Sequence, residues 1–198
     1  MNRQKKRKEE LKIKFIKCGK EMIKESGIDN FSLRKLADHI GYSYTTIYNY
    51  FSSMDEYLWY VSLTFIEELV EVISISGENS CDNINLFLEK IESYYRYYFE
   101  NPNVFKFLFF YPLEMPSKDI KEEFEKPVLW NILLKGLYDY FDDEDNAESK
   151  IENIGNIIVS VIHGKLLFYF SKKEEIGKEE IIIETKQNIE FLLSVEKN

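Results

Sequence analysis

Histidine and cysteine are scarce in this chain, with two of each among 198 residues. His39, His163, Cys18 and Cys81 lie far apart in the sequence and form no motif with the spacing of a metal site. A glycine-rich phosphate loop and a nucleophile elbow are also missing. We therefore predict no metal, no cofactor and no enzyme activity, and the two cysteines suit a reducing cytoplasm.

Long uninterrupted hydrophobic runs are absent as well. The most apolar stretches, residues 104–113 and 154–170, are too short to span a bilayer or are interrupted by Asn156, His163 and Lys165. The charged N-terminal start does not have the pattern of a secretory signal. We expect no membrane association and a cytoplasmic protein.

The charge is divided unevenly along the chain. Residues 1–54 carry 12 Lys and Arg against 6 Asp and Glu, a net charge of +6, whereas the rest carries 14 against 29, a net charge of −15. The basic residues of the opening segment are Arg3, Lys5, Lys6, Arg7 and Lys8. Such a flexible cationic arm could lie along DNA phosphates or in a minor groove, or serve only to keep the chain soluble.

Residues 32–51 are predicted to form two short helices joined by a tight turn. An apolar stripe of the first helix is formed by Leu33, Leu36, Ala37 and Ile40. Ser32 is the expected N-cap, Gly41 accepts the left-handed backbone that ends the helix, and Ser43 caps the second helix. This spacing predicts a helix-turn-helix.

The second helix has a polar outer face. Ile47 and Phe51 are four residues apart and point inward, which leaves Thr45 and Asn49 at the centre of the outward face. Hydroxyl and amide groups there can bond to base edges in a major groove, where an ordinary surface helix would carry Lys and Glu. The predicted DNA-binding residues are Ser32, Arg34, Ser43, Tyr44, Thr45, Thr46, Tyr48, Asn49 and Tyr50.

With these features, the N-terminal quarter, residues 15–58, resembles the TetR family of transcriptional regulators. The matching elements are Phe15-Ile16, Cys18-Gly19, Met22-Ile23, Gly27, the segment SLRKLA at 32–37, Gly41, Ile47-Tyr48, Tyr50-Phe51, and Ser53 with Asp55-Glu56. Cys18 and Gly19 would let neighbouring helices approach, and Gly27 would close the first helix in a left-handed cap. Ser53 with Glu56 would make a capping box.

Met54 departs from the family pattern, which commonly has a phosphate-binding lysine at this position. Losing that cation should cost some sequence-independent affinity and reduce the salt dependence by roughly one phosphate contact. The reading face itself is unaffected.

The resemblance implies an all-α protein with two domains: a helix-turn-helix domain over residues 1–54 and a helical ligand-sensing and dimerisation domain over 55–198. Within the second domain, Gly77 is expected to end one helix and Asp82 to cap the next. A further helix is expected to start at Ser117, and Pro127 either kinks that helix or starts a second one.

The second domain is rich in aromatic residues, which suits a flat or hydrophobic ligand. The candidate ligand-binding residues are Tyr94, Tyr98, Phe109, Trp130 and His163. Simple core packing is the alternative for each aromatic residue, because AT-rich codons favour these residue types.

The last two helices, predicted over 150–171 and 178–195, form the homodimer in this interpretation, as they generally do in the family. Two apolar bands are assigned to the contact: Ile154, Ile158, Val161, Ile162, Leu166 and Tyr169, and Ile182, Ile189 and Leu193. Gly155 and Gly164 would permit close helix approach. The alternative is that both helices belong to a single monomeric bundle. A symmetric pair requires a near-palindromic operator with half-sites roughly 34 Å apart.

These features predict a sequence-specific repressor that a small-molecule effector releases from double-stranded operator DNA. Two alternatives remain open. A protein of the same fold could organise the chromosome or recruit another protein without an inducer. A ligand-binding bundle could also have lost DNA reading, and Met54 is the only support for that alternative.

Overall fold

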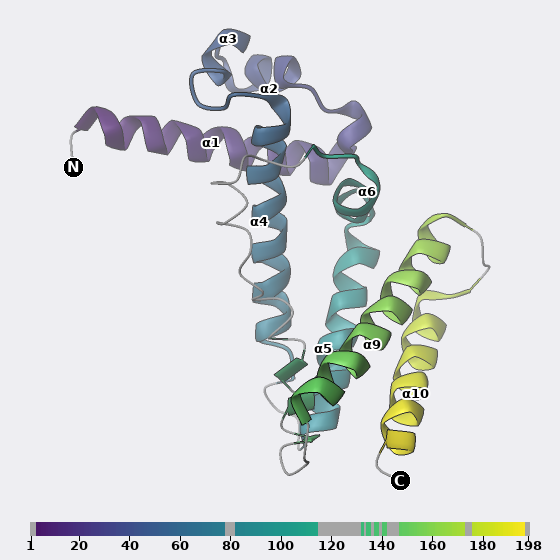
Figure 1. Cartoon of the computed structure of the whole chain (residues 1–198). Coiled ribbons are helices and arrows are strands. Elements are labelled where there is room, and N and C mark those ends of the chain that lie inside the picture. The colour runs from purple at the N-terminus through teal and green to yellow at the C-terminus, as the bar shows by residue number, and fades with distance from the viewer. Residues whose placement is uncertain are drawn as a thin grey trace. The chain divides into compact units, whose positions relative to one another are not determined.

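The computed structural model describes residues 3–77, 82–114, 132, 134, 135, 137, 138, 140, 141, 147–172 and 176–196. Among these residues the chain is helical and contains no strand, which confirms the all-α prediction (Figure 1). Two compact units are present: residues 1–68 with 101–126, and residues 69–100 with 127–198. The predicted domain boundary after residue 54 stays a prediction.

The first unit contains the helices expected for a helix-turn-helix domain. Its elements are α1 (Arg3–Ser26), the 3-10 helix η1 (Ile28–Asn30), α2 (Leu33–Ile40), α3 (Tyr44–Ile47), the first part of α4 (Met54–Ser74), and α6 (Pro102–Phe110). The buried side chains of its core include Phe15, Ile23, Leu36, Ala37, Ile47, Tyr57, Phe65 and Phe107. One apolar core therefore holds the helix-turn-helix against α1 and α4.

Helix α1 crosses α4 at Gly19, where the two helices approach closely (Figure 1). The Tyr57 hydroxyl of α4 donates a hydrogen bond to the Phe15 carbonyl oxygen at 2.9 Å. A Cβ atom at position 19 would lie 1.7 Å from that hydroxyl oxygen, so glycine is the residue that fits. The close helix approach predicted at this position is confirmed.

A second contact between α1 and α4 is ionic. Glu68 pairs with Lys20 at 2.5 Å and with Lys24 at 2.6 Å. Burial on its own raises the pKa of Glu68, but the hydrogen bonds and charges of the two lysines outweigh it and hold the pKa below its usual value. The carboxylate therefore stays ionised between the two helices.

The N-terminal basic arm is helical, because α1 already begins at Arg3. The expectation of a flexible extension is therefore wrong for the described residues. Lys, Arg, Gln and Glu are good helix formers, and Lys6 pairs with Glu10 one turn later at 4.0 Å. These local preferences carry the helix beyond the packed core.

The other end of α1 also differs in detail from the expectation. The helix ends at Ser26, and Gly27 follows with a φ of 80° and a ψ of 160°. The positive φ favours glycine as predicted, but the extended ψ lies outside the left-handed helical region. The predicted left-handed cap is thus replaced by a sharp exit from the helix.

The second unit is also helical. It contains the end of α4, α5 (Asn83–Glu100), α9 (Ala147–Phe170) and α10 (Lys178–Glu196). Gly77, with a φ of 77°, follows the end of α4, and the Asp82 carboxylate caps α5 by accepting from the Asn85 amide at 2.8 Å. Both features were expected from the sequence. The helix start expected at Ser117, and the kink or helix start expected at Pro127, lie outside the described residues.

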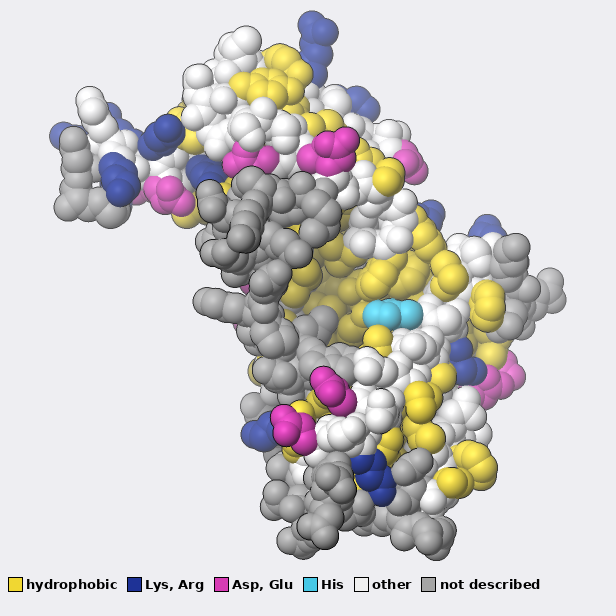
Figure 2. All heavy atoms as spheres, viewed as in Figure 1, with side chains coloured by type: hydrophobic (Ala, Val, Ile, Leu, Met, Phe, Trp, Pro, Cys, Tyr) yellow, Lys and Arg dark blue, Asp and Glu magenta, His cyan; other side chains and the backbone are white. Residues whose placement is uncertain are grey.

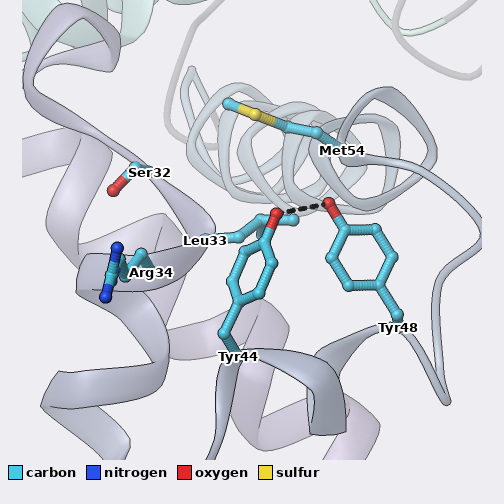
Figure 3. Close-up of a pocket in the computed structure, with 6 residues that line it drawn as sticks. All are labelled: Ser32, Leu33, Arg34, Tyr44, Tyr48 and Met54. Carbon is cyan, nitrogen blue, oxygen red and sulfur yellow. Dashed lines mark hydrogen bonds between the residues drawn. The ribbon is translucent and has the colours of Figure 1, made fainter.

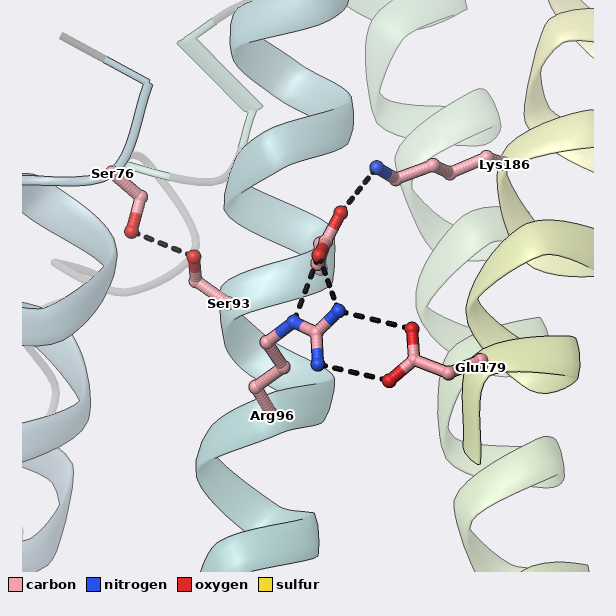
Figure 4. Close-up of polar contacts among 6 residues, drawn as sticks. Ser76, Ser93, Arg96, Glu179 and Lys186 are labelled. Carbon is pink, nitrogen blue, oxygen red and sulfur yellow. Dashed lines mark hydrogen bonds and ion pairs between the residues drawn. The ribbon is translucent and has the colours of Figure 1, made fainter. Parts of the chain in front are cut away.

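Ion pairs join α10 to α5 in this unit. The Arg96 guanidinium of α5 donates two bonds of 3.0 Å to the Glu179 carboxylate of α10 and a third, of 2.8 Å, to Glu92 (Figure 4). Lys186 of α10 donates to the other oxygen of Glu92. The hydrogen bond from Lys186 leads the effects that lower the pKa of Glu92, and burial opposes them. The network fixes α10 against α5.

The assignment of the two apolar bands to the dimer contact is wrong for most of their residues. Most of their members are buried within the second unit: Ile154, Ile158, Ile162, Leu166, Ile182, Ile189 and Leu193. These bands pack inside the bundle, because each helix also needs an apolar side for its own unit. The exposed side of each helix carries a different set of residues.

One helix of the described chain is long and apolar enough to span a membrane by length and composition, over Glu148–Phe170. Two polar contacts tie this helix into its own unit. His163 bonds to Tyr94 at 2.7 Å, and Lys165 pairs with Glu184 at 2.5 Å. We therefore interpret it as a helix of the bundle.

Candidate nucleic-acid interface

The turn between α2 and α3 is built as the sequence predicts. The Ser32 hydroxyl accepts from the Lys35 amide at 3.2 Å and caps α2. Gly41 ends the helix in the left-handed conformation, with a φ of 78°. Ser43 then caps α3 by accepting from the Thr46 amide at 3.2 Å. These caps set the direction in which α3 leaves the turn.

Helix α3 is shorter than the second helix expected from the sequence, since it covers only Tyr44–Ile47. Beyond it the chain tightens into turns, in which the Asn49 amide donates to Thr46 at 3.2 Å and the Tyr50 amide donates to Ile47 at 2.9 Å. Ile47 and Phe51 are both buried as predicted. These two residues therefore still anchor the segment in the core, although its last turn is not α-helical.

Most of the predicted DNA-binding residues lie at the surface of the helix-turn-helix. Arg34, Ser43, Tyr44, Thr45, Tyr48 and Asn49 are exposed, and Ser32, Thr46 and Tyr50 are half-buried. The Ser43 hydroxyl lies 2.9 Å from that of Thr45 and 2.7 Å from that of Thr46. A hydroxyl with two alternative partners can turn toward a base edge or a phosphate. Contact of these residues with DNA stays a prediction.

A pocket of about 530 Å³ lies beside this surface. Its described lining residues are Ser32, Leu33, Arg34, Tyr44, Tyr48 and Met54 (Figure 3). The Tyr44 and Tyr48 hydroxyls lie 2.9 Å apart, and their rings meet edge to face at 5.2 Å. This hydrogen bond raises the pKa of Tyr48. The two rings thus stand as one hydroxyl-tipped unit on α3 and the turn that follows it.

Met54 lines the same pocket, at the position where the family resemblance predicts a lysine. Arg34 is the one cationic residue among the described lining residues. Leu33 also lines the pocket, but the sequence predicted it only as a core residue. Its side chain is 3% exposed, and no sequence signal separates such a buried residue from one that borders a pocket. The pocket combines an apolar floor with phenol and guanidinium donors.

The start of α4 is capped next to this pocket. The Ser53 hydroxyl accepts from the Glu56 amide at 3.0 Å, which is the first half of the predicted capping box. The Glu56 carboxylate, however, accepts from the Ser52 amide at 2.6 Å. The second half of the box is therefore shifted by one residue.

The predicted ligand-binding residues are distributed over both units. Tyr94, Tyr98 and His163 belong to the second unit, where the Tyr94 hydroxyl lies 2.7 Å from His163 Nε2 and the two tyrosine rings lie 5.0 Å apart. Burial raises the pKa of Tyr94 and lowers the pKa of His163. Phe109 is exposed in the first unit, and Trp130 lies outside the described residues. Ligand binding by this set stays a prediction.

Comparison with known proteins agrees with this geometry. Residues 15–58 match the family model for bacterial regulatory proteins of the tetR family. This match covers α2, α3, the turn between them and the start of α4. No curated protein sequence matches the chain.

Solved structures resemble the chain over most of its length. A tetR-family transcriptional regulator from Streptomyces coelicolor has a TM-score of 0.71 and 13% identity, covering 93% of this chain and 83% of its own. The TetR family transcriptional regulator PfmR from Thermus thermophilus has a TM-score of 0.61 and 19% identity, covering 88% and 96%. A TetR family transcription regulator from Marinobacter aquaeolei has a TM-score of 0.61 and 15% identity, covering 96% and 97%.

At these identities the structural likeness establishes the fold, and the N-terminal match falls on the helix-turn-helix that Ser32, Gly41 and Ser43 cap. Residues 15–58 are therefore a DNA-binding domain of the tetR family, and the chain as a whole has the fold of TetR-family transcriptional regulators.

Proposed function

We propose that this regulator is a cytoplasmic repressor that reads a near-palindromic operator as a homodimer and leaves it when a small hydrophobic or aromatic molecule binds the second unit. The observation that carries sequence-specific reading is the face from Ser43 to Asn49, which is largely exposed and contains no charged residue. Because it carries no cation, a face of this kind gains little binding free energy from DNA phosphates. Its hydroxyl and amide groups match the donors and acceptors of base edges in the major groove.

Arg34 adds a second kind of reading group beside that face. Its side chain is exposed at the start of α2 and lines the pocket shared with Tyr44 and Tyr48. Arginine pairs with guanine through two parallel hydrogen bonds, which is the commonest specific contact to a base. We therefore expect Arg34, Thr45 and Asn49 to contribute most of the base discrimination.

Dimerisation is supported by the outer faces of α9 and α10. Ile157, Leu167 and Phe168 are exposed on α9, and Ile183 and Phe191 are exposed on α10. In each helix, the spacing of these residues places them on one side. Figure 2 shows hydrophobic side chains over this part of the molecule. Exposed apolar residues at this density usually mark a contact surface.

The α9 part of this face is almost free of charge, which favours a second copy as its partner. Between Asn153 and Phe168 no Asp, Glu, Lys or Arg is exposed, and Lys165 is already paired with Glu184. Gly164 has no atom within 4 Å of the position that a Cβ would occupy. The open space would allow a helix of the partner to approach closely.

The dimer is tested by placing a charge in this face. Phe191→Glu should convert the dimer to a monomer in sedimentation experiments and weaken operator binding, because one reading head cannot hold both half-sites. Asn188→Glu adds the same charge to an exposed position of α10 outside the apolar stripe and should leave the dimer intact. Equal behaviour of the two variants would contradict this assignment.

A ligand site in the second unit is supported by polar groups inside its aromatic core. Tyr94 and Tyr98 are buried to 4% and 2% exposure, and the Tyr94 hydroxyl shares a hydrogen bond with His163. Buried polar groups among aromatic rings can orient one polar atom of an otherwise hydrophobic ligand. These residues therefore favour a flat, largely apolar effector.

The repressor proposal is tested with whatever small molecule co-purifies with the protein. Mass spectrometry identifies the molecule, and its addition to the protein bound to a selected operator should lower the affinity by about 5- to 150-fold, the usual range of allosteric coupling. Tyr94→Phe should weaken this response without changing operator affinity in the absence of ligand. A regulator that stays on its operator at saturating ligand would contradict the release mechanism.

A further inference from the structure

The pocket beside the reading face has an apolar floor to which the proposed function gives no role. Leu33 and Met54, the first residues of α2 and α4, form this floor. Leu33 is 3% exposed, and Met54 is half-buried. Figure 3 shows both side chains on the side to which the Tyr44 and Tyr48 hydroxyls point. The starts of α2 and α4 and the outer side of α3 therefore meet at one apolar spot on the surface.

The Tyr44 and Tyr48 rings form the wall of the pocket that adjoins the reading face. Tyr44 directly precedes Thr45, and Tyr48 directly precedes Asn49. Both rings are exposed, and their hydroxyls hold each other at 2.9 Å. A base edge in contact with Thr45 and Asn49 therefore lies close to the mouth of the pocket.

The chemistry of the pocket favours a base over a phosphate. Its described lining contains one charged residue, Arg34, and no carboxylate. A phosphate above Leu33 and Met54 would lose hydration without gaining a polar partner from them. Among the groups that base pairs present in the major groove, the C5-methyl group of thymine is the apolar one. The floor of the pocket therefore matches thymine.

We propose that the pocket receives the C5-methyl group of one thymine in each operator half-site, with Leu33 and Met54 as its contacts. The inference rests on the proposed function, because the methyl group reaches the pocket only when α3 lies in the major groove. The volume of about 530 Å³ exceeds that of a methyl group and leaves room for the base edge that carries it. Met54 then adds a sequence preference at a position where the family resemblance predicts a cation for phosphate.

Replacement of thymine by deoxyuridine tests the proposal, because it removes only this methyl group from the duplex. Each thymine of a selected operator is replaced in turn, and the affinities are measured at one salt concentration. Burial of one methyl-sized group is worth about fourfold in affinity, so one thymine in each half-site should show a loss of about fourfold. Replacement in both half-sites together should give a loss of about 16-fold.

Two methionine variants assign the effect to the pocket. Met54→Ala should reduce the loss at the sensitive thymine to less than about twofold, because it removes most of the apolar contact. Met22→Ala makes the same change at a half-buried position of α1 that lines a different pocket, and it should keep the fourfold loss. Both duplexes are measured with the same protein, so a change in the amount of folded protein does not alter their ratio.

A methyl group on another base gives a rescue experiment. Cytosine at the sensitive position should bind more weakly than thymine. 5-Methylcytosine carries a methyl group at the same place in the major groove and should recover about fourfold in affinity relative to cytosine. Equal affinities for the two cytosine duplexes would overturn the inference.

Two further results would overturn it while leaving the proposed function intact. In the first, the protein prefers its operator but no thymine loses more than about twofold on replacement, so the pocket holds no methyl group. In the second, Met54→Ala and Met22→Ala show the same loss, so another residue contacts the methyl group. A protein without preference for any duplex would contradict the proposed function as well.

Discussion

Substitution of Gly19 by alanine tests whether the α1–α4 crossing supports the first unit. The added Cβ would lie 1.7 Å from the Tyr57 hydroxyl oxygen and 2.8 Å from its Cζ. Tyr57 is fully buried and its hydroxyl donates to the Phe15 carbonyl, so the ring cannot move without a cost. Overpacking costs about 1–3 kcal/mol and loss of the hydrogen bond about 1 kcal/mol.

Alanine also has a higher helix propensity than glycine, which offsets about 1 kcal/mol of this cost. The net destabilisation should be about 1–3 kcal/mol, measured by urea unfolding of the purified protein. Tyr57→Phe is the matched second variant, because it removes the oxygen atom that lies closest to the new Cβ. In the Tyr57→Phe background, the cost of Gly19→Ala should fall by about 1 kcal/mol or more.

Two results would refute this reasoning. Gly19→Ala could stabilise the protein, which would mean that the helices separate easily at this crossing. The cost could also be the same in both backgrounds within about 0.5 kcal/mol, which would mean that the Tyr57 hydroxyl is not the atom in conflict.

Three further predictions concern DNA affinity, pH and an ion pair. Met54→Lys should add about 0.9 to the salt slope and strengthen binding to a random duplex. Burial lowers the pKa of His163 below its usual value of 6.5, so at acidic pH the unfolded chain binds more protons than the folded protein. The free energy of unfolding should therefore be highest above pH 6.5 and should fall as the pH drops through the pKa of the folded state. In urea titrations, His163→Gln should abolish this loss of stability. Arg96→Lys should cost less than about 1 kcal/mol in the same assay, because the bidentate bond to Glu179 is half-exposed.

Local sequence signals predicted the helix-turn-helix well, because each of these signals depends on only one or two residues. Ser32 and Ser43 cap the expected helices, and Gly41 has the left-handed conformation that ends α2. The closeness of α1 and α4 at Gly19 was also predictable, since a small residue inside a helix favours close packing. Such features follow from backbone geometry and need no knowledge of distant parts of the chain.

Features that depend on distant packing were not predictable in the same way. An apolar stripe shows that a helix buries a face, but not whether its own unit or a partner covers that face. Ile158 and Ile189 were therefore assigned to the dimer although the unit buries them itself, while Ile157 and Phe191 carry the exposed apolar face.

Base reading by the outer face of α3 and the turn after it is the central claim. Thr45→Ala and Asn49→Ala test it most directly, with affinities measured on a selected operator and on a random duplex at the same salt concentration. Ser43 still caps α3 in both variants through the Thr46 amide, so the fold should be kept. We expect a loss of about 1–3 kcal/mol on the operator alone. An equal loss on both duplexes would contradict base reading.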